Sequence, residues 1–226
     1  MKNKNYDTFI FDLGRVLVDF DHQISARKIA ELTGRDEAWL YQLFFESELT
    51  KLFDEGKILP RHFYNEIKKL TGLGISFDEF SVIWVDIFKE KKDVCEFAAS
   101  VKNDYRLVLM SNVNKLQFEH IRRVFPVISI MDALVLSYQV GAMKPDPKIY
   151  ERAIKASQTS PERIIYADDR PELIEGAKLA GIKSSFVFRD LEGFEADLEN
   201  IGITIDEYDS LAVARDNGRL GMKFSN

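Results

Sequence analysis

The 226-residue sequence contains one cysteine and three histidines, and each scarcity excludes a class of structure or site. With Cys95 alone, the chain forms no internal disulfide, which favours a reducing compartment such as the cytoplasm. The histidines His22, His62 and His120 do not share the spacing of a metal site, and each lies in a segment of helical pattern. We therefore assign no role to the histidines and interpret Cys95 as a core residue.

Long apolar runs and an excess of positive charge are also missing. No run of about 18 apolar residues is present, so we expect no membrane span, and the N-terminus lacks the apolar stretch of a signal peptide. The net charge is −6 and the basic residues are dispersed, so we do not expect nucleic acid as a partner. The expectation is a cytoplasmic monomer or homodimer that acts on a small molecule.

Five short and nearly continuous apolar runs are present, and such runs are typical of strands that are covered on both faces. The strands are predicted at 8–11, 105–111, 134–137, 163–167 and 184–188. Helical patterns separate most of them, at 115–124, 146–157 and 171–180. Alternation of strands and helices predicts an α/β fold with a parallel sheet.

The pattern changes between the first two strands, where helical spacing dominates and no convincing strand is found. Helices are predicted at 22–33, 36–46, 60–71 and 77–91, with Asp36 and Ser76 as N-caps. We expect a helical insert in an α/β protein. The predicted division is a core of 1–19 and 94–203, a helical insert of 20–93, and a polar C-terminal tail of 204–226.

Four aromatic residues of the insert fall at helical spacing, namely Phe44, Phe45, Trp84 and Phe88. Such a stripe is more often the core of a helical bundle than a platform for a ligand, because it is the face that neighbouring helices cover. We interpret these residues as core.

Polar residues cluster where the predicted strands end. Asp12 follows the first strand, Ser111-Asn112 end the second, and Asp168-Asp169 follow the strand at 163–167, while Lys144 lies in a loop. Strand ends on one side of a parallel sheet form a shared crevice. A carboxylate, a hydroxyl, an ammonium and a pair of acids there indicate magnesium-dependent phosphoryl transfer. The alternatives are a solvated turn or a helix cap for the two acids, a helix N-cap for Ser111 and a surface position for Lys144.

These segments together resemble the haloacid dehalogenase-like (HAD) hydrolase superfamily over nearly the whole chain, from Phe9 to about Ile203. The matching motifs are Asp12-Leu-Gly14-Arg-Val, Ser111-Asn112, Gly141-Ala-Met-Lys144-Pro145, and Asp168-Asp169 ahead of Gly176-Ala177. The resemblance implies a Rossmann-like parallel sheet core flanked by helices, with a four-helix bundle inserted as a type 1 cap. It also implies an aspartate nucleophile, a Mg²⁺ cofactor and, in most members, phosphatase activity.

The resemblance implies a role for each matching residue of the metal and nucleophile site. Asp12 is the nucleophile and also a metal ligand, Asp169 gives a second ligand, and the backbone carbonyl of Gly14 gives a third. Asp168 is either a further ligand or an acid that orients the metal-bound waters.

The phosphate-binding and substrate-binding residues follow in the same way. Ser111 and the N–H of Asn112 would bind the phosphoryl oxygens, and Lys144 would neutralise their charge and restrain the nucleophile. The turn that contains Glu55 and Lys57 resembles the turn that caps of this family present to the active site. Either residue is then a contact for a polar group of the substrate or part of a solvated turn, and Arg15 is a further candidate.

The sequence departs from the family pattern at Gly14, where many phosphatases have a second aspartate as general acid and base. The loss of such a group typically costs about 10²–10⁴ in rate. Either the substrate has a good leaving group, or a cap residue or metal-bound water supplies the proton, or catalysis is largely lost. We favour the first outcome, with a sugar 1-phosphate as substrate. A second departure is Glu172, which either holds a metal-bound water or Lys144 or is only a first-turn helix acid.

The predicted function is a magnesium-dependent phosphomonoester hydrolase that acts on a small phosphometabolite through an aspartyl-phosphate. Two alternatives stay open. A 2-haloacid dehalogenase uses the same aspartate on carbon without a metal, and a non-catalytic protein binds phosphometabolites without turnover.

Overall fold

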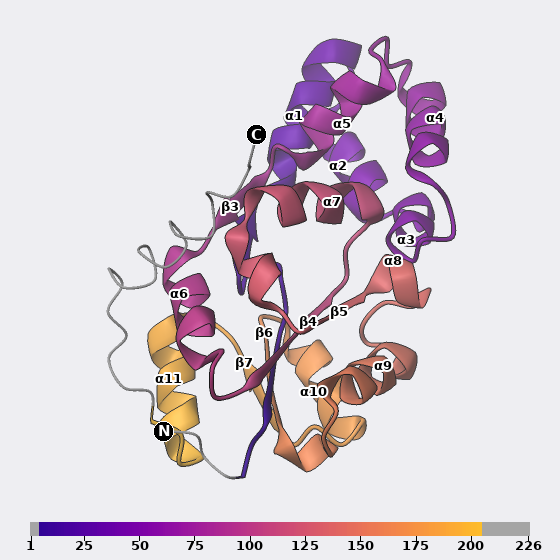
Figure 1. Cartoon of the computed structure of the whole chain (residues 1–226). Coiled ribbons are helices and arrows are strands. Elements are labelled where there is room, and N and C mark those ends of the chain that lie inside the picture. Colours follow the sequence, from indigo (N-terminus) through magenta and orange to yellow (C-terminus); the bar gives the residue numbers. More distant parts are fainter. Residues whose placement is uncertain (1–4, 205–226) are drawn as a thin grey trace, which may run out of the picture.

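The computed structural model describes residues 5–204, and a five-stranded parallel sheet lies at its centre (Figure 1). The strand order is β5-β4-β1-β6-β7. The strands are β1 Thr8–Phe11, β4 Arg106–Ser111, β5 Ala133–Leu136, β6 Ile164–Asp168 and β7 Ser184–Val187. All five predicted strands are confirmed, with ends that differ by one residue at most. The α/β fold class is therefore correct.

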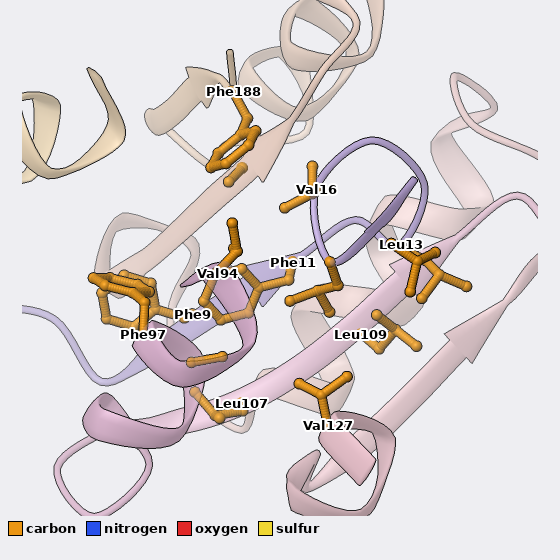
Figure 2. Close-up of a cluster of buried hydrophobic side chains, with 14 of the residues drawn as sticks. Phe9, Phe11, Leu13, Val16, Val94, Phe97, Leu107, Leu109, Val127 and Phe188 are labelled. Atoms are coloured by element: carbon orange, nitrogen blue, oxygen red, sulfur yellow. The ribbon is translucent and has the colours of Figure 1, made fainter. Parts of the chain in front are cut away.

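Helices cover both faces of this sheet, which explains why its strands are apolar throughout. The helices of the core are α6 Lys92–Val101, α7 Lys115–Val124, α8 Ser137–Val140, α9 Pro147–Ser157, α10 Pro171–Leu179 and α11 Leu191–Asn200, with 3₁₀ turns η1 Pro126–Ile130 and η2 Pro161–Arg163. In β1, Phe9 and Phe11 pack with α6, α7 and α11 on one face, as Figure 2 shows for the buried cluster around them. Ile10 points to the other face and packs with α9 and α10.

The register of the sheet brings the predicted site residues to one edge. Phe11 is paired with Leu109 of β4 and with Ala167 of β6, so the three strands end almost level. The residue after β1 and the last residues of β4 and β6 are Asp12, Ser111 and Asp168. The crevice predicted from the sequence is therefore present at this edge.

The insert contains five helices, which we call the cap, rather than the four that the resemblance implies. They are α1 His22–Thr33, α2 Glu37–Phe45, α3 Glu48–Asp54, α4 Pro60–Thr71 and α5 Phe77–Val85, and they pack around their own apolar cluster. The predicted N-caps are confirmed, since Asp36 accepts from Trp39 N at 2.8 Å and Ser76 forms a capping box with Glu79. The helix α3 was not predicted, although Ser47 caps it in the usual way.

A two-stranded antiparallel ribbon joins the core to the cap, and the prediction of no strand in this region is wrong. Strand β2 (Val18–Phe20) pairs with β3 (Phe88–Glu90), and Phe20 lies opposite Phe88. The helix predicted at 77–91 therefore ends at Val85. Strands of three residues are too short to show a period of two, so Phe88 extended the helical pattern in the sequence instead.

Within residues 5–204, no helix is both long and apolar enough to cross a membrane. The predicted C-terminal tail lies outside the described residues except for Thr204.

Candidate active site

Asp12 lies in the crevice directly after β1 and is 7% exposed. Its backbone N–H donates to Ala167 O of β6 at 3.0 Å, which continues the sheet pairing for one residue beyond the strand. Its carboxylate Oδ1 accepts from Lys144 Nζ at 2.7 Å. The structure therefore brings Lys144 and Asp12 into direct contact, while their roles in a reaction stay a prediction.

Lys144 reaches the crevice from a loop and is 4% exposed, so it is not a surface lysine. Its Nζ also lies 2.5 Å from Asp168 Oδ2 and 3.2 Å from Met110 O. The side chain of Asn112 fixes the lysine backbone: its Nδ2 donates to Lys144 O at 3.0 Å, and its Oδ1 accepts from Lys144 N at 2.7 Å. The Asn112 side chain thus positions the lysine, a role that the sequence did not reveal.

Tyr166 completes this network and was not predicted. Its hydroxyl donates to Asp168 Oδ2 and lies 3.3 Å from Lys144 Nζ. Burial and the neighbouring carboxylates raise its pKa well above the ordinary value, so the hydroxyl stays protonated as a donor. The signal available in the sequence was its position in β6, two residues before Asp168 and hence on the same face of the sheet.

The electrostatics of the crevice are those of two carboxylates that share one ammonium. Burial raises the pKa of Asp12, and Lys144 only partly opposes this. Burial by itself would lower the pKa of Lys144, but Asp12 and Asp168 outweigh it and raise that pKa. The lysine is therefore charged. Additional positive charge near Asp12 would stabilise its buried, ionised carboxylate.

Three acids are close enough to hold a metal ion, since one carboxylate oxygen each of Asp12, Asp168 and Asp169 lies within 4.8 Å of the others. Both oxygens of Asp168 already accept hydrogen bonds, Oδ2 from Lys144 and Tyr166, and Oδ1 from Arg170 N at 3.0 Å. Asp169 is half-buried, and burial and then the charge of Asp168 raise its pKa. The donor set is oxygen only, which fits Mg²⁺.

Ser111 is buried at the end of β4, and Ser111 and Asn112 line a cavity of about 110 Å³ between the core and the cap. Ser111 is not the N-cap of α7. Asn114 takes that place, and its Oδ1 accepts from Gln117 N at 3.0 Å. The alternative of a capping role for Ser111 is therefore wrong.

Gly14 also lines this cavity, and the structure shows what occupies the place of a side chain there. A Cβ atom at Gly14 would lie 2.7 Å from Cε1 of Phe20, which is far too close for an unmoved ring. Phe20 belongs to β2, and its ring packs against His22 with 4.6 Å between the centroids. An acid at position 14 is therefore incompatible with Phe20 as it is placed here.

The three candidate substrate residues do not line the cavity in the described part of the chain. Arg15 pairs with Asp19 at 3.4 Å, at the protein surface. Glu55 and Lys57 pair with each other at 2.6 Å. Their neighbour Asp54 lines the cavity instead, so the predicted turn does face the site but through a different residue.

Asp54 connects the cap to the core. Its Oδ1 accepts from Asn114 Nδ2 at 3.0 Å, and its backbone carbonyl accepts from Ser137 Oγ at 2.6 Å. Burial raises its pKa to about 6, against the hydrogen bond from Asn114. Two residues on, Gly56 has φ +68°, and a Cβ there would lie 2.1 Å from Tyr138 O. The turn after α3 is thus fitted closely to the core.

The aromatic residues of the cap divide between two roles. Phe44 and Trp84 lie in the cap core as predicted, and Phe45 packs against it, whereas Phe88 packs against the cluster of the α/β core. Phe45, Trp84 and Phe88 also line the cavity, as does His22, to which we had assigned no role. Their signal in the sequence was weak because His22 and Trp84 are 62 positions apart, and only the fold brings them together.

Glu172 lies away from the crevice chemistry. It is 55% exposed in the first turn of α10 and pairs with Arg170 at 2.5 Å. This supports its interpretation as a first-turn helix acid.

Comparisons with known proteins agree with this geometry. A family model described as haloacid dehalogenase-like hydrolase matches residues 9–187. The chain is 25% identical over 182 residues to a D-ribitol-5-phosphate phosphatase from Bacteroides thetaiotaomicron, covering 77% of this chain and 88% of that one. It is 24% identical over 181 residues to a sesquiterpene phosphatase from Aspergillus oryzae, covering 76% and 85%.

A solved structure shares the fold. It is a HAD family enzyme from Bacteroides thetaiotaomicron in complex with magnesium and inorganic phosphate. The TM-score is 0.75 at 19% identity, and the match covers 84% of this chain and 98% of that one.

Proposed function

The chain belongs to the haloacid dehalogenase-like hydrolase family, and from this we propose that it is a magnesium-dependent phosphomonoester hydrolase acting on a small phosphometabolite. The observation that carries the proposal is the buried Asp12 carboxylate, held by Lys144 at 2.7 Å at the edge of the sheet where Asp168 and Asp169 also lie. The phosphatase relatives support the reaction class, and the magnesium and phosphate bound to the Bacteroides enzyme support the cofactor.

The residues that would hold Mg²⁺ are Asp12, Asp169 and the backbone carbonyl of Gly14. Asp168 is better suited to orient Lys144, because hydrogen bonds already use both of its oxygens. When bound, the ion supplies the positive charge that lets an anionic nucleophile approach an anionic phosphate. The raised pKa of Asp12 in the structure without metal is consistent with this need.

The reaction then has two steps that share one phosphate-binding site. Asp12 Oδ attacks phosphorus in line, the bond to the leaving oxygen breaks, that oxygen takes a proton from solvent, and an aspartyl-phosphate forms. Water next attacks phosphorus and gives a proton to solvent, the bond from phosphorus to Asp12 Oδ breaks, and inorganic phosphate leaves with the Asp12 carboxylate restored. Ser111 Oγ and the N–H of Asn112 bind the phosphoryl oxygens in both steps, and Lys144 neutralises their charge.

Gly14 restricts the substrate, because it leaves no acid beside the leaving oxygen. We therefore place a sugar 1-phosphate, whose anomeric oxygen leaves readily, ahead of an ordinary alkyl phosphate. The test is a matched pair, D-ribose 1-phosphate against D-ribose 5-phosphate. A kcat/KM at least tenfold higher for the 1-phosphate supports the assignment, and equal values would reject it.

The activity itself is tested with a phosphometabolite panel in the presence of Mg²⁺. Phosphate release should fall by at least about 10³-fold in Asp12→Asn, which keeps the shape but removes the nucleophile. Asp104→Asn, at an exposed aspartate, is the matched control and should keep wild-type activity. EDTA should abolish turnover.

Two other outcomes would replace the proposal. Halide release from 2-haloacids that persists in EDTA would identify a dehalogenase. Binding of phosphate and of a trifluoroberyllate mimic without turnover of any phosphoester would identify a non-catalytic phosphometabolite-binding protein.

A further inference from the structure

The cavity between the core and the cap has one wall from each. Gly14, Ser111 and Asn112 form the core wall, where the phosphoryl group would bind, and the cap side includes His22 and Trp84. The cavity has a volume of about 110 Å³ and is partly open to solvent.

Two nitrogen atoms on the cap side have no hydrogen-bond partner. Among residues 5–204, three buried side-chain polar atoms make no hydrogen bond: His22 Nδ1, Trp84 Nε1 and Glu55 Oε2. Glu55 Oε2 nevertheless has the ion pair with Lys57 at 2.6 Å. The other two atoms belong to residues that line the same cavity. Since buried polar groups are normally paired, these two nitrogens are open to a group that enters the cavity, whether water or a polar group of a substrate.

Ring stacking holds both residues in place. The His22 ring lies on Phe45 with 3.7 Å between the centroids and 13° between the planes, and Phe45 stacks on Trp84 at 5.4 Å. Trp84 is 1% exposed and also stacks on Phe80 at 5.6 Å. These contacts restrain both rings in the orientation that leaves the two nitrogens unpaired.

The chemistry of these nitrogens selects the ligand. The indole N–H is a donor only, so it needs an oxygen acceptor. Burial, and then the charge of Arg15, lower the pKa of His22 to about 4, so the imidazole is neutral and offers a donor or an acceptor but no charge. A hydroxyl group satisfies both sites because it donates and accepts. A hydrocarbon satisfies neither.

We propose that His22 and Trp84 are specificity residues that bind hydroxyl groups on the leaving group, so that a substrate with a hydroxylated leaving group is preferred to one with an apolar leaving group. This rests on the proposed phosphatase function. The D-ribitol-5-phosphate phosphatase among the relatives supports hydroxyl recognition, whereas the sesquiterpene phosphatase shows that the family also takes hydrocarbon leaving groups. The unpartnered nitrogens decide between the two for this chain.

The test compares D-ribitol 5-phosphate with n-pentyl phosphate, which has the same chain length and phosphate but no further hydroxyls. Wild-type protein should prefer ribitol 5-phosphate in kcat/KM. Trp84→Phe and His22→Phe keep the stacked rings and remove only the nitrogens. Each should lower kcat/KM for ribitol 5-phosphate about tenfold and leave that for pentyl phosphate unchanged.

The sequence offers a matched control for each variant. Trp39 is 40% exposed in α2, and His62 is exposed in α4. Trp39→Phe and His62→Phe should therefore leave kcat/KM unchanged for both substrates. Equal losses on both phosphates, no loss on either, or a wild-type preference for pentyl phosphate would each overturn the proposal. Melting temperatures of all four variants identify any that do not fold. If Trp84→Phe does not fold, the result for His22→Phe decides the test, because His22 is less buried than Trp84.

Binding separates this proposal from the proposed function. Calorimetry on Asp12→Asn with Mg²⁺ measures the affinity for both phosphates without turnover. If wild-type protein hydrolyses neither, the phosphatase assignment fails. The hydroxyl proposal then stands only if ribitol 5-phosphate still binds more tightly than pentyl phosphate and loses this advantage in the Trp84→Phe background.

Discussion

The core and the cap hold the polar groups near their junction in opposite ways. On the core side, Lys144 Nζ lies 2.7 Å from Asp12 and 2.5 Å from Asp168, so the charged groups fix one another. On the cap side, His22 and Trp84 are fixed by ring stacking, and their nitrogens are left open.

This difference separates chemistry from recognition. A reacting carboxylate must be held firmly before the substrate arrives, and opposite charge at short distance does this in a buried site. A recognition surface must instead keep its hydrogen-bond donors and acceptors free for the ligand. Its side chains are therefore held by apolar contacts rather than by hydrogen bonds. Substitutions in the core should therefore act on turnover and ionisation, and those in the cap on selectivity and docking.

The largest effect should follow removal of the charge at the centre of the core network. Lys144→Met leaves two buried carboxylates without their shared cation, and we expect a loss of about 3–5 kcal/mol in the free energy of unfolding and of at least about 10² in turnover. Urea unfolding in EDTA and phosphate release measure the two. The control is Lys148→Met, at an exposed lysine of α9. Similar losses of stability and turnover in both variants would show that the contacts of Lys144 with Asp12 and Asp168 contribute to neither.

The next effect tests how closely the cap is fitted to the core. Gly56 and Gly72 both have positive φ, +68° and +77°, but a Cβ meets Tyr138 O at 2.1 Å only at Gly56 and meets nothing within 4 Å at Gly72. Replacing either by alanine should cost about 1 kcal/mol for the backbone conformation. Gly56→Ala should cost about 1–3 kcal/mol more for the close contact. Equal melting temperatures would mean that the cap docks without this turn.

A pH dependence should come from the carboxyl group that joins cap to core. Burial raises the pKa of Asp54 from 3.8 to about 6, so the unfolded chain loses this proton at lower pH than the folded one does. The protonated Asp54 therefore adds about 2–3 kcal/mol to the free energy of unfolding. This stabilisation is fully present below about pH 4 and is lost as the pH rises through about 6. Unfolding free energies of wild type and Asp54→Asn at pH 4, 5, 6 and 7 should show this difference, and a constant difference would contradict it.

The smallest effect should come from the hydroxyl that supports Asp168. Tyr166→Phe keeps the buried ring and removes the donor to Asp168 and the contact with Lys144. We expect a loss of about 1 kcal/mol in stability and a several-fold lower kcat with KM unchanged. Tyr105→Phe, at a buried tyrosine remote from the site, is the control. An unchanged kcat would show that Asp168 needs no such support.

The core was predictable because its signals are local. Each strand is a continuous apolar run, and Asp12, Ser111 and Asp168 stand at strand ends that a parallel sheet must bring together. The remaining core features depend on contacts across the chain. Nothing in the sequence near Asn112 shows that its side chain bonds to the backbone of a residue 32 positions away.

The cap was less predictable because its informative features are short or long-range. The strands β2 and β3 have three residues each, and pairing stabilises them rather than any pattern of their own. Trp84 was expected in the core of the cap, and it does lie there. The same residue also lines the cavity, which the sequence did not indicate. Composition indicates that a residue is buried, and only packing shows whether its polar atom has a partner.

The contact between Gly14 and the Phe20 ring has a consequence for how this sequence can change. Any side chain at position 14 would meet the Phe20 ring unless that half-buried ring moves. Because Phe20 lies opposite Phe88 in the ribbon, such a movement would be felt where the core meets the cap. The effects of substitutions at positions 14 and 20 should therefore not be additive.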